Sequence, residues 1–408
     1  MSRSPGLRPG LHSAAGYAGL LNGQYQADST FQVSQRVLRL ANEPARVSDS
    51  ITLGISVLQA MNTETPFETF LNQHDDEAWS AALVTLLRSI QEVDRNATQI
   101  WFAFYPLPLF RALEQSADRE KLAHQLLLQG DYELKDQVDT SHAFLYGHRF
   151  WPQVKKAVEQ HAELFNQTLR VSLADQILAV AHRIARQLQK DDSLLVGITA
   201  VAFMTVQQTG VAALKSAPGA ISIDSKHAKK SPEQILRERA KQDSQGLLGF
   251  LRTVNRQFTV THDENDDKAK YKLNDGQDLA WGAASDQARD WRAIDPRRVE
   301  GPIPVECRSA SCGTCWVGVL GGAKKLADVG AREGKKIKEF GYIDTAEPKP
   351  LIRLACQAQA QGAVSVVIPP WNGQFGKHLK ALKEERDTPV VQPDDPTQSD
   401  RPTNDAVN

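Results

Sequence analysis

Four cysteines are the residues of this chain whose type and spacing best indicate chemistry. Cys307, Cys312 and Cys315 follow the spacing C-x4-C-x2-C, Cys356 stands far downstream, and the sequence has no other cysteine. Three ligands within nine residues cannot converge from a regular helix or strand, so they require a tight loop. Small residues from Ser309 to Thr314 let its backbone N–H groups turn inward. Four thiolates, two for each iron, are what a [2Fe–2S] cluster needs.

This loop resembles the plant-type [2Fe–2S] ferredoxin family, including the copies that are fused into larger proteins. The resemblance rests on the cysteine spacing, on Pro304-Val305-Glu306 before it, and on Leu354-Ala355-Cys356-Gln357 after it. It covers roughly residues 246–376, about a third of the chain. It implies a β-grasp fold, which is a mixed sheet that holds one helix. It also implies a reduction potential of about −400 mV. It also implies the iron ligands, which are Cys307, Cys312, Cys315 and Cys356.

The sequence departs from the family pattern at two places. Between Cys315 and Cys356 lie 40 residues, more than simple plant ferredoxins usually have, so we expect an insertion there. Ala310 stands where the family often has glycine, and alanine tolerates a positive φ less well than glycine does.

Zinc and disulfides are the two other interpretations of four cysteines. Structural zinc sites favour paired C-x2-C knuckles, and only one C-x2-C is present. Two disulfides would suit a secreted protein, but the sequence shows no evident secretory signal, and four cysteines in 408 residues are not a disulfide scaffold. The cluster is the favoured interpretation.

Composition and charge narrow the class of protein further. The 408 residues suggest two or three domains, and 48 Lys+Arg against 49 Asp+Glu give a net charge of −1, so we expect no nucleic-acid partner. The first 27 residues lack acidic side chains, which fits an organellar targeting segment, although a flexible terminus and a cytoplasmic protein are favoured. Leu194–Leu214 is uncharged but contains Gln207 and Gln208, which favours a buried helix over a membrane span.

Residues 31–214 predict an all-α domain of six to eight helices, after a disordered segment over 1–30. One helix should begin at Asp75-Asp76, and another should follow Ser172 as its N-cap. Two apolar stripes at helical spacing support them: Trp79, Leu83, Leu86, Leu87 and Ile90, and Leu173, Ile177, Val180, Ile184 and Leu188. Two prolines within Trp101–Phe110 should break a helix there.

Residues 215–245 predict a linker and a connecting helix that starts at Ser231-Pro232. Residues 246–376 then form the ferredoxin-like domain, and 384–408 a disordered tail, so the fold class is an all-α domain followed by an α+β, β-grasp domain. A helical pattern runs around Leu279–Trp291. The expected strands are Gln257–Thr261, Ala269–Leu273, Trp316–Leu320 and Val364–Ile368.

Other candidate sites are weaker. His142 and His148 could bind haem or a metal, but six residues along a helix turn through about 600°, which separates their faces, so core or surface histidines are favoured. Asp75, Asp76 and Glu77 are helix-start charges rather than metal ligands. The sequence has no G-x-G-x-x-G, P-loop, H-E-x-x-H or nucleophile-elbow pattern, so no small-molecule substrate site is evident.

A basic segment lies inside the expected insertion. Residues 323–338 carry a net charge of +4, which would suit an acidic redox partner, although an ordinary solvated helix face gives the same pattern. The lysines that could contact such a partner are Lys324, Lys325, Lys335, Lys336 and Lys338.

These patterns favour a non-catalytic electron carrier or a subunit of an oxidoreductase complex. It would move one electron at a time through the cluster, with the helical domain docking it into a larger redox system. A scaffold or regulatory protein with a structural or sensory cluster is the alternative. A helical oxygenase or reductase is disfavoured, because the sequence shows no flavin or nicotinamide motif.

Overall fold

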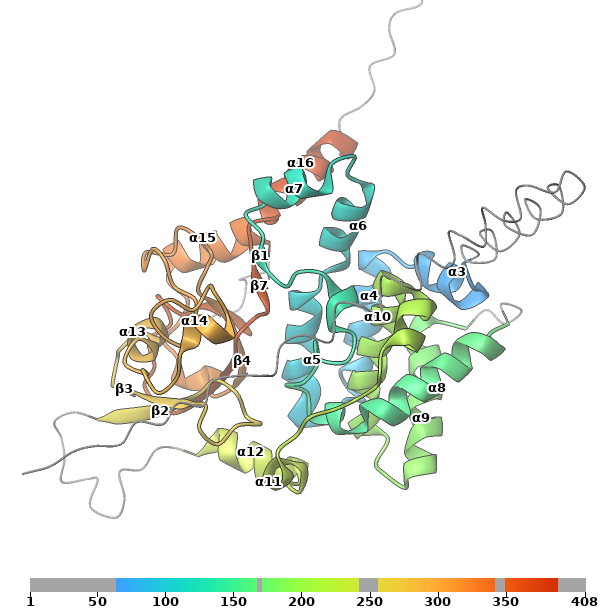
Figure 1. Ribbon diagram of the computed structural model, residues 1–408, viewed down its shortest axis with the longest axis horizontal. Helices are drawn as coiled ribbons and strands as arrows, with labels where there is room; N and C mark the ends of the chain where they lie inside the picture. Colours follow the sequence, from blue (N-terminus) through green and yellow to red (C-terminus); the bar gives the residue numbers. More distant parts are fainter. Residues whose placement is uncertain (1–63, 167–170, 242–255, 342–348, 388–408) are drawn as a thin grey trace, which may run out of the picture. The chain divides into compact units, whose positions relative to one another are not determined.

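The computed structural model describes residues 64–166, 171–241, 256–341 and 349–387 (Figure 1). The predicted disorder over 1–30 therefore lies outside the described residues, as does most of the predicted tail. Thr65 and the chain that follows it form one compact unit, which contains both the helices and the sheet.

The N-terminal half of this unit is helical, as the sequence predicts. Its α-helices number eight within the described residues, at the upper end of the expected range. They are α3 (Pro66–Asn72), α4 (Asp76–Leu86), α5 (Glu92–Phe104), α6 (Leu107–Gln115), α7 (Arg119–Gln125), α8 (Trp151–Leu164), α9 (Leu173–Leu188) and α10 (Ser193–Ser216). Two 3₁₀ turns, η1 (Leu134–Gln137) and η2 (Tyr146–Phe150), lie between α7 and α8.

Local signals set the helix boundaries. The Asp75 carboxylate accepts a hydrogen bond from Ala78 N, and the Ser172 hydroxyl accepts one from Asp175 N, so the predicted helix start at Asp75-Asp76 and the predicted N-cap Ser172 are both confirmed. The predicted break is also confirmed, since α5 ends at Phe104 and Pro106 caps α6. The first predicted apolar stripe extends beyond its helix, because it includes Leu87 and Ile90 whereas α4 ends at Leu86.

Helix α10 forms the centre of the helical half. It is long and apolar enough to cross a membrane, yet 78% of its apolar window is buried inside the protein, which confirms the predicted buried helix. It contacts α3, α5, α8 and α9. A kink at Gly210 (φ 84°) frees a backbone donor, and the Glu68 carboxylate of α3 accepts the resulting bond from Val211 N at 2.7 Å.

The C-terminal half contains a mixed five-stranded sheet with the order β3-β2-β6-β4-β5. Strands β2 and β3 form an antiparallel hairpin, β2 and β6 are parallel, and β4 is antiparallel to both β6 and β5. The predicted strands are confirmed to within one or two residues, whereas β5 is not predicted. The strands are β2 (Gln257–Thr261), β3 (Lys270–Asn274), β4 (Trp316–Gly321), β5 (Ile352–Leu354) and β6 (Val364–Val367).

The helices of this half differ from the prediction. In place of one helix around Leu279–Trp291 there are two short ones, α13 (Leu279–Ala283) and α14 (Trp291–Ile294). The side chain of Asp290 accepts a hydrogen bond from Ala293 N and so starts a new helix there. Two further helices are α15 (Ala331–Phe340), which agrees with the helix-face alternative for the basic segment, and α16 (Gly376–Asp387), which is not predicted. Because α16 continues to Asp387, the first residues assigned to the disordered tail are helical.

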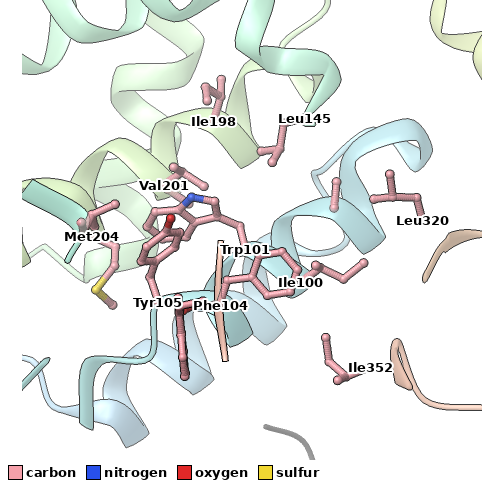
Figure 2. Packing of buried hydrophobic residues seen from close by; sticks show 14 of the residues in the cluster. Ile100, Trp101, Phe104, Tyr105, Leu145, Ile198, Val201, Met204, Leu320 and Ile352 are labelled. Atoms are coloured by element: carbon pink, nitrogen blue, oxygen red, sulfur yellow. The ribbon is translucent and has the colours of Figure 1, made fainter. Parts of the chain in front are cut away.

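Helix α5 joins the two halves through a shared hydrophobic core (Figure 2). A Cβ atom on Gly318 of β4 would lie 2.5 Å from Cγ2 of Ile100, so only glycine allows α5 to approach this closely. The rings of Phe104 and Trp316 meet edge to face at 5.1 Å between centroids. A two-stranded sheet of β1 (Gln129–Gly130) and β7 (Trp371–Asn372) also links the halves.

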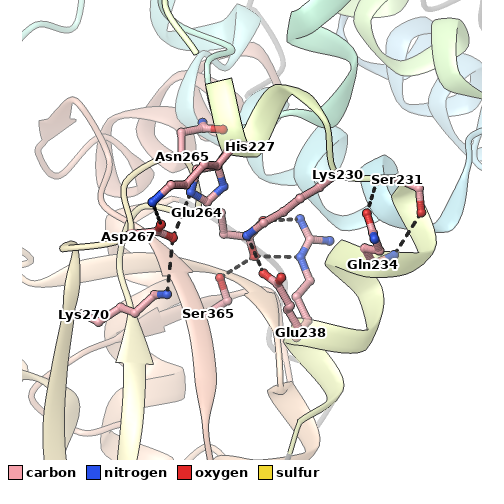
Figure 3. A network of polar contacts seen from close by, with 12 residues as sticks. His227, Lys230, Ser231, Gln234, Glu238, Glu264, Asn265, Asp267, Lys270 and Ser365 are labelled. Carbon is pink, nitrogen blue, oxygen red and sulfur yellow. Dashed lines mark hydrogen bonds and ion pairs between the residues drawn. The ribbon is translucent and has the colours of Figure 1, made fainter. Parts of the chain in front are cut away.

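The connecting segment adds a polar joint. It contains α11 (Ser225–Ala228) and α12 (Pro232–Ala240), and Ser231 and Gln234 form the capping box at the start of α12. Arg239 donates to both carboxylate oxygens of Glu264, at 2.8 and 2.9 Å, and to the carbonyl of Val93 at 2.7 Å. Glu264 also accepts a bond from Ser365, and His227 contacts Asp267 (Figure 3).

Candidate metal centre

The four cysteines lie together as two pairs. The Sγ atoms of Cys307 and Cys312 are 3.1 Å apart, and the side chains of Cys315 and Cys356 hydrogen-bond to each other. The first pair is half-buried, whereas Cys315 and Cys356 are 2% and 7% exposed. The pairs therefore differ in their distance from solvent.

Strand register explains the inner pair. Cys315 immediately precedes β4, and Cys356 follows the end of β5 by two residues. Because Trp316 is opposite Leu354 in this antiparallel pair, the two cysteines leave the sheet side by side. Ala355 N donates to the Cys315 carbonyl at 2.8 Å and extends the ladder between them.

The outer pair depends on an unusual loop conformation. Arg308, Ala310 and Gly313 have φ angles of 49°, 59° and 75°, in the left-handed region. These turns direct the backbone N–H groups of Ser309 and Ser311 toward Cys307 Sγ, at 3.5 and 3.3 Å. Ala310 therefore adopts the conformation in which the sequence analysis found alanine less suitable than glycine, at a cost of about 1–2 kcal/mol.

Within each pair, the pKa of one cysteine is lowered and that of the other is raised. Burial raises the pKa of Cys307, but hydrogen bonds from Ser311, Cys312 and Ser309 outweigh it and lower this pKa to about 6. The hydrogen bond from Cys315 lowers the pKa of Cys356 to about 7. Burial raises the pKa of Cys312, and the contact with Cys356 raises that of Cys315. Each pair thus holds one thiolate readily, and thiolates are the form that binds iron.

The donor set fits a centre of two irons. A structural zinc ion needs four ligands about one point, whereas a [2Fe–2S] cluster takes two thiolates on each iron. The side chains of Cys307 and Cys312 contact each other, as do those of Cys315 and Cys356. The two cysteine pairs match the second arrangement.

Two glutamine amides support the loop. Gln357 Nε2 lies 3.6 Å from Cys356 Sγ and also donates to the Cys356 carbonyl at 2.8 Å. Gln374 Nε2 donates to the carbonyl of Cys312 at 2.9 Å. The first amide can stabilise charge on a ligand sulfur, and the second fixes the backbone of the outer pair.

The segment expected as an insertion contains α15, which supports the strand before Cys356. Glu333 of α15 accepts from Arg353 Nε and Nη2, at 2.8 and 2.9 Å, and from Leu354 N at 2.9 Å. The two charged side chains are 2% and 1% exposed. In the sequence, Glu333 is one of two acidic residues, with Asp328, that reduce the net charge of residues 323–338 to +4. Its spacing from the buried Ile337 and Phe340 could have placed it on the inner face.

The histidine pair is arranged differently from the prediction, although it lies in the core as favoured. His142 and His148 are not on one α-helix, because the chain between them turns into η2, and their Nδ1 atoms are 2.9 Å apart. His142 Nε2 donates to the carbonyl of Val138, so His148 Nδ1 must donate to His142 Nδ1. Burial lowers the pKa of His148 to about 4 and holds the pKa of His142 well below its usual range, so both rings are neutral.

Comparison with known families identifies the C-terminal region. Residues 296–361, which include all four cysteines, match the family model of the 2Fe-2S iron-sulfur cluster binding domain. This part of the chain is therefore a ferredoxin-like domain, and its cofactor is a [2Fe–2S] cluster. No curated protein and no solved structure matches the chain.

Proposed function

We propose that this protein is a one-electron carrier and works as a ferredoxin-like component or subunit of a larger redox system. The observation that supports it most is the division of the cysteines into an inner, buried pair and an outer, half-buried pair. Bound there, the cluster would supply reversible one-electron chemistry. We assign Cys307 and Cys312 to one iron and Cys315 and Cys356 to the other.

The chain's own groups favour this role. N–H donors of Ser309, Ser311 and Gln357 point at ligand sulfurs and can stabilise the negative charge that accumulates on reduction. The β4–β5 ladder and the bond from Leu354 N to Glu333 of α15 position the inner pair, and fixed ligands would lower the reorganisation that electron transfer requires. The half-buried outer pair leaves one edge of the site close to a partner.

The sheet also supports a β-grasp assignment for this domain. Its order β3-β2-β6-β4-β5 has a hairpin at one edge and a parallel pair at its centre, which a mixed sheet holding a helix requires. The proposed setting is a reducing compartment such as the cytoplasm, which would keep the four thiols available for iron.

A structural or sensory cluster is the second candidate function. The packing of α5 on β4, next to Cys315, favours it, since loss of the cluster could disturb the helical half through this contact. In this case the cluster would report or maintain a conformation without exchanging electrons in turnover.

Electron paramagnetic resonance with potentiometric titration separates the two candidates. We expect protein purified without oxygen to be silent as isolated, and to give a reversible S = 1/2 signal at low potential after dithionite. A sample that contains zinc, or a cluster that is destroyed by a single reduction, would overturn the carrier function. Loss of helical packing on cluster removal, without reversible reduction, would support the second candidate.

A further inference from the structure

We propose that the redox partner docks on the surface formed by α15 and α16, and that the partner's matching face is acidic. This inference rests on the proposed electron-transfer function and adds the place and charge of the contact. It concerns the exposed side chains of two helices that contact each other, α15 and α16 (Figure 1).

Both helices are close to the outer cysteine pair. Phe340, the last residue of α15, packs under the loop, since a Cβ atom on Gly313 would lie 3.1 Å from its ring. Gln374, two residues before α16, donates to the carbonyl of Cys312. Gly341 and Gly376 meet where α15 ends and α16 begins, because a Cβ on Gly341 would lie 2.8 Å from Gly376. A partner bound to this surface would thus be separated from Cys307 and Cys312 by one layer of residues.

The surface carries an excess of positive charge. Within α15 and residues 376–385 of α16, the Lys and Arg residues are Arg332, Lys335, Lys336, Lys338, Lys377, Lys380 and Lys383. Against these seven stand Glu339, Glu384 and Glu385, which leaves a net charge of +4. Glu333 does not reduce it, because this carboxylate is buried against Arg353.

Three of these lysines surround a single carboxylate. Glu339 lies 2.5 Å from Lys336 and 3.9 Å from Lys335. The hydrogen bond from Lys336 and the charges of Lys335 and Lys377 lower the pKa of Glu339, so one carboxylate faces three ammonium groups. Such a field attracts an acidic face and orients it during encounter.

The structure divides the five lysines of the predicted docking segment. Lys325 Nζ donates to the carbonyls of Ala240 and Lys241, at 3.3 and 2.9 Å, so it holds the end of α12. Lys324 lies beside it, at the far end of β4 from Cys315. The other three lysines of the segment, Lys335, Lys336 and Lys338, lie on α15. Helix α16 extends this surface with Lys377, Lys380 and Lys383, which lie outside the predicted docking segment.

Two small oxidants of opposite charge can test this inference. The dithionite-reduced protein is mixed in a stopped-flow instrument with trianionic hexacyanoferrate(III) or tricationic hexaamminecobalt(III). We compare the wild type with Lys335→Glu/Lys377→Glu. A control, Lys156→Glu/Lys229→Glu, makes the same change in net charge on α8 and beside α11. The ratio of the two rates removes any change in driving force.

At low salt we expect the anion-to-cation rate ratio to fall about tenfold or more in the α15–α16 variant and to stay near the wild-type value in the control. The difference should shrink above about 0.1 M salt, where the Debye length is about 10 Å. Equal ratios in all three proteins, or equal falls in both variants, would overturn the docking surface. If the wild-type signal itself does not cycle, the proposed function fails first, which is a distinguishable result.

Discussion

The helical half and the sheet half bury polar groups for different ends. In the helical half, Asp94 is fully buried and accepts bonds from Tyr146 N and Gly147 N, at 2.5 and 2.7 Å. Burial raises its pKa to about 6. Together with the neutral histidine pair, it fixes loops between helices.

In the sheet half, the buried pair of Glu333 and Arg353 positions a strand that ends next to Cys356, while Cys307 and Cys312 stay half-buried. The comparison teaches that buried polarity in the first half holds loops between helices, and that in the second half it positions the strand that leads to the buried cysteine pair. The two are joined by α5 and Arg239, so the helices also stiffen the site.

The largest expected effect is at the cysteines. Cys312→Ala removes half of the outer pair, so one iron loses a ligand, and we expect no [2Fe–2S] signal and iron and sulfide contents near zero. Ser311→Ala, one residue away, should retain the cluster. A full reduced signal in Cys312→Ala would contradict the ligand assignment.

The second-largest effect is expected at Glu333, which supports the strand that leads to the inner cysteine pair. Glu333→Gln leaves Arg353 buried without a counter-charge, and we expect a loss of about 3–5 kcal/mol in the free energy of unfolding, with faster loss of visible absorbance. The matched change Glu339→Gln alters an acid near the surface of the same helix and should cost less than about 1 kcal/mol. Similar losses in the two variants would show that burial of Glu333 is not what matters.

The joint between the halves is the third test. Arg239→Met leaves the largely buried Glu264 carboxylate without a counter-charge. We therefore expect about 3 kcal/mol of destabilisation, seen in both helical circular dichroism and cluster absorbance. Arg239→Met/Glu264→Met should recover most of this loss, because no lone charge remains. If cluster absorbance kept its wild-type transition in the single variant, the two halves would be energetically independent.

A smaller effect is expected at the amide beside Cys356. Gln357→Met keeps the length of the side chain but removes the N–H that faces Cys356 Sγ, so the reduced form loses stabilisation. We expect the reduction equilibrium to shift up to about tenfold toward the oxidised form, which lowers the midpoint potential by about 59 mV. Gln374→Met removes a donor to a carbonyl and should shift the potential less. A midpoint potential that rises in Gln357→Met would contradict the role of this amide in stabilising the reduced cluster.

The smallest effect concerns pH. Burial, with Arg298 and Arg289 nearby, lowers the pKa of His262 to about 4, below the value of about 6.5 in an unfolded chain. The folded state therefore binds fewer protons, so this contribution is present above about pH 6.5 and is lost as pH falls toward 4.

His262→Phe keeps a ring next to Trp291 and should flatten the fall in unfolding free energy by up to about 1.4 kcal/mol per pH unit within this window. Denaturant unfolding between pH 7.5 and 5.5 measures it.

The sequence by itself determined the local features of both halves. The caps Asp75, Ser172 and Ser231, the break at Pro106 and the boundaries of β2 depend on neighbours a few residues away, so pattern and turn chemistry could predict them. The cysteine spacing likewise sufficed to predict the cluster, because three of the four predicted ligands lie in one short loop.

Only the tertiary structure decided which distant groups meet. It placed Cys356 beside Cys315 through the register of β4 and the unpredicted β5, and it turned Glu333 inward. It also brought the two histidines together and separated Lys325 from the lysines of α15. These outcomes depend on the packing of segments far apart in the sequence, whose partners a local pattern does not specify.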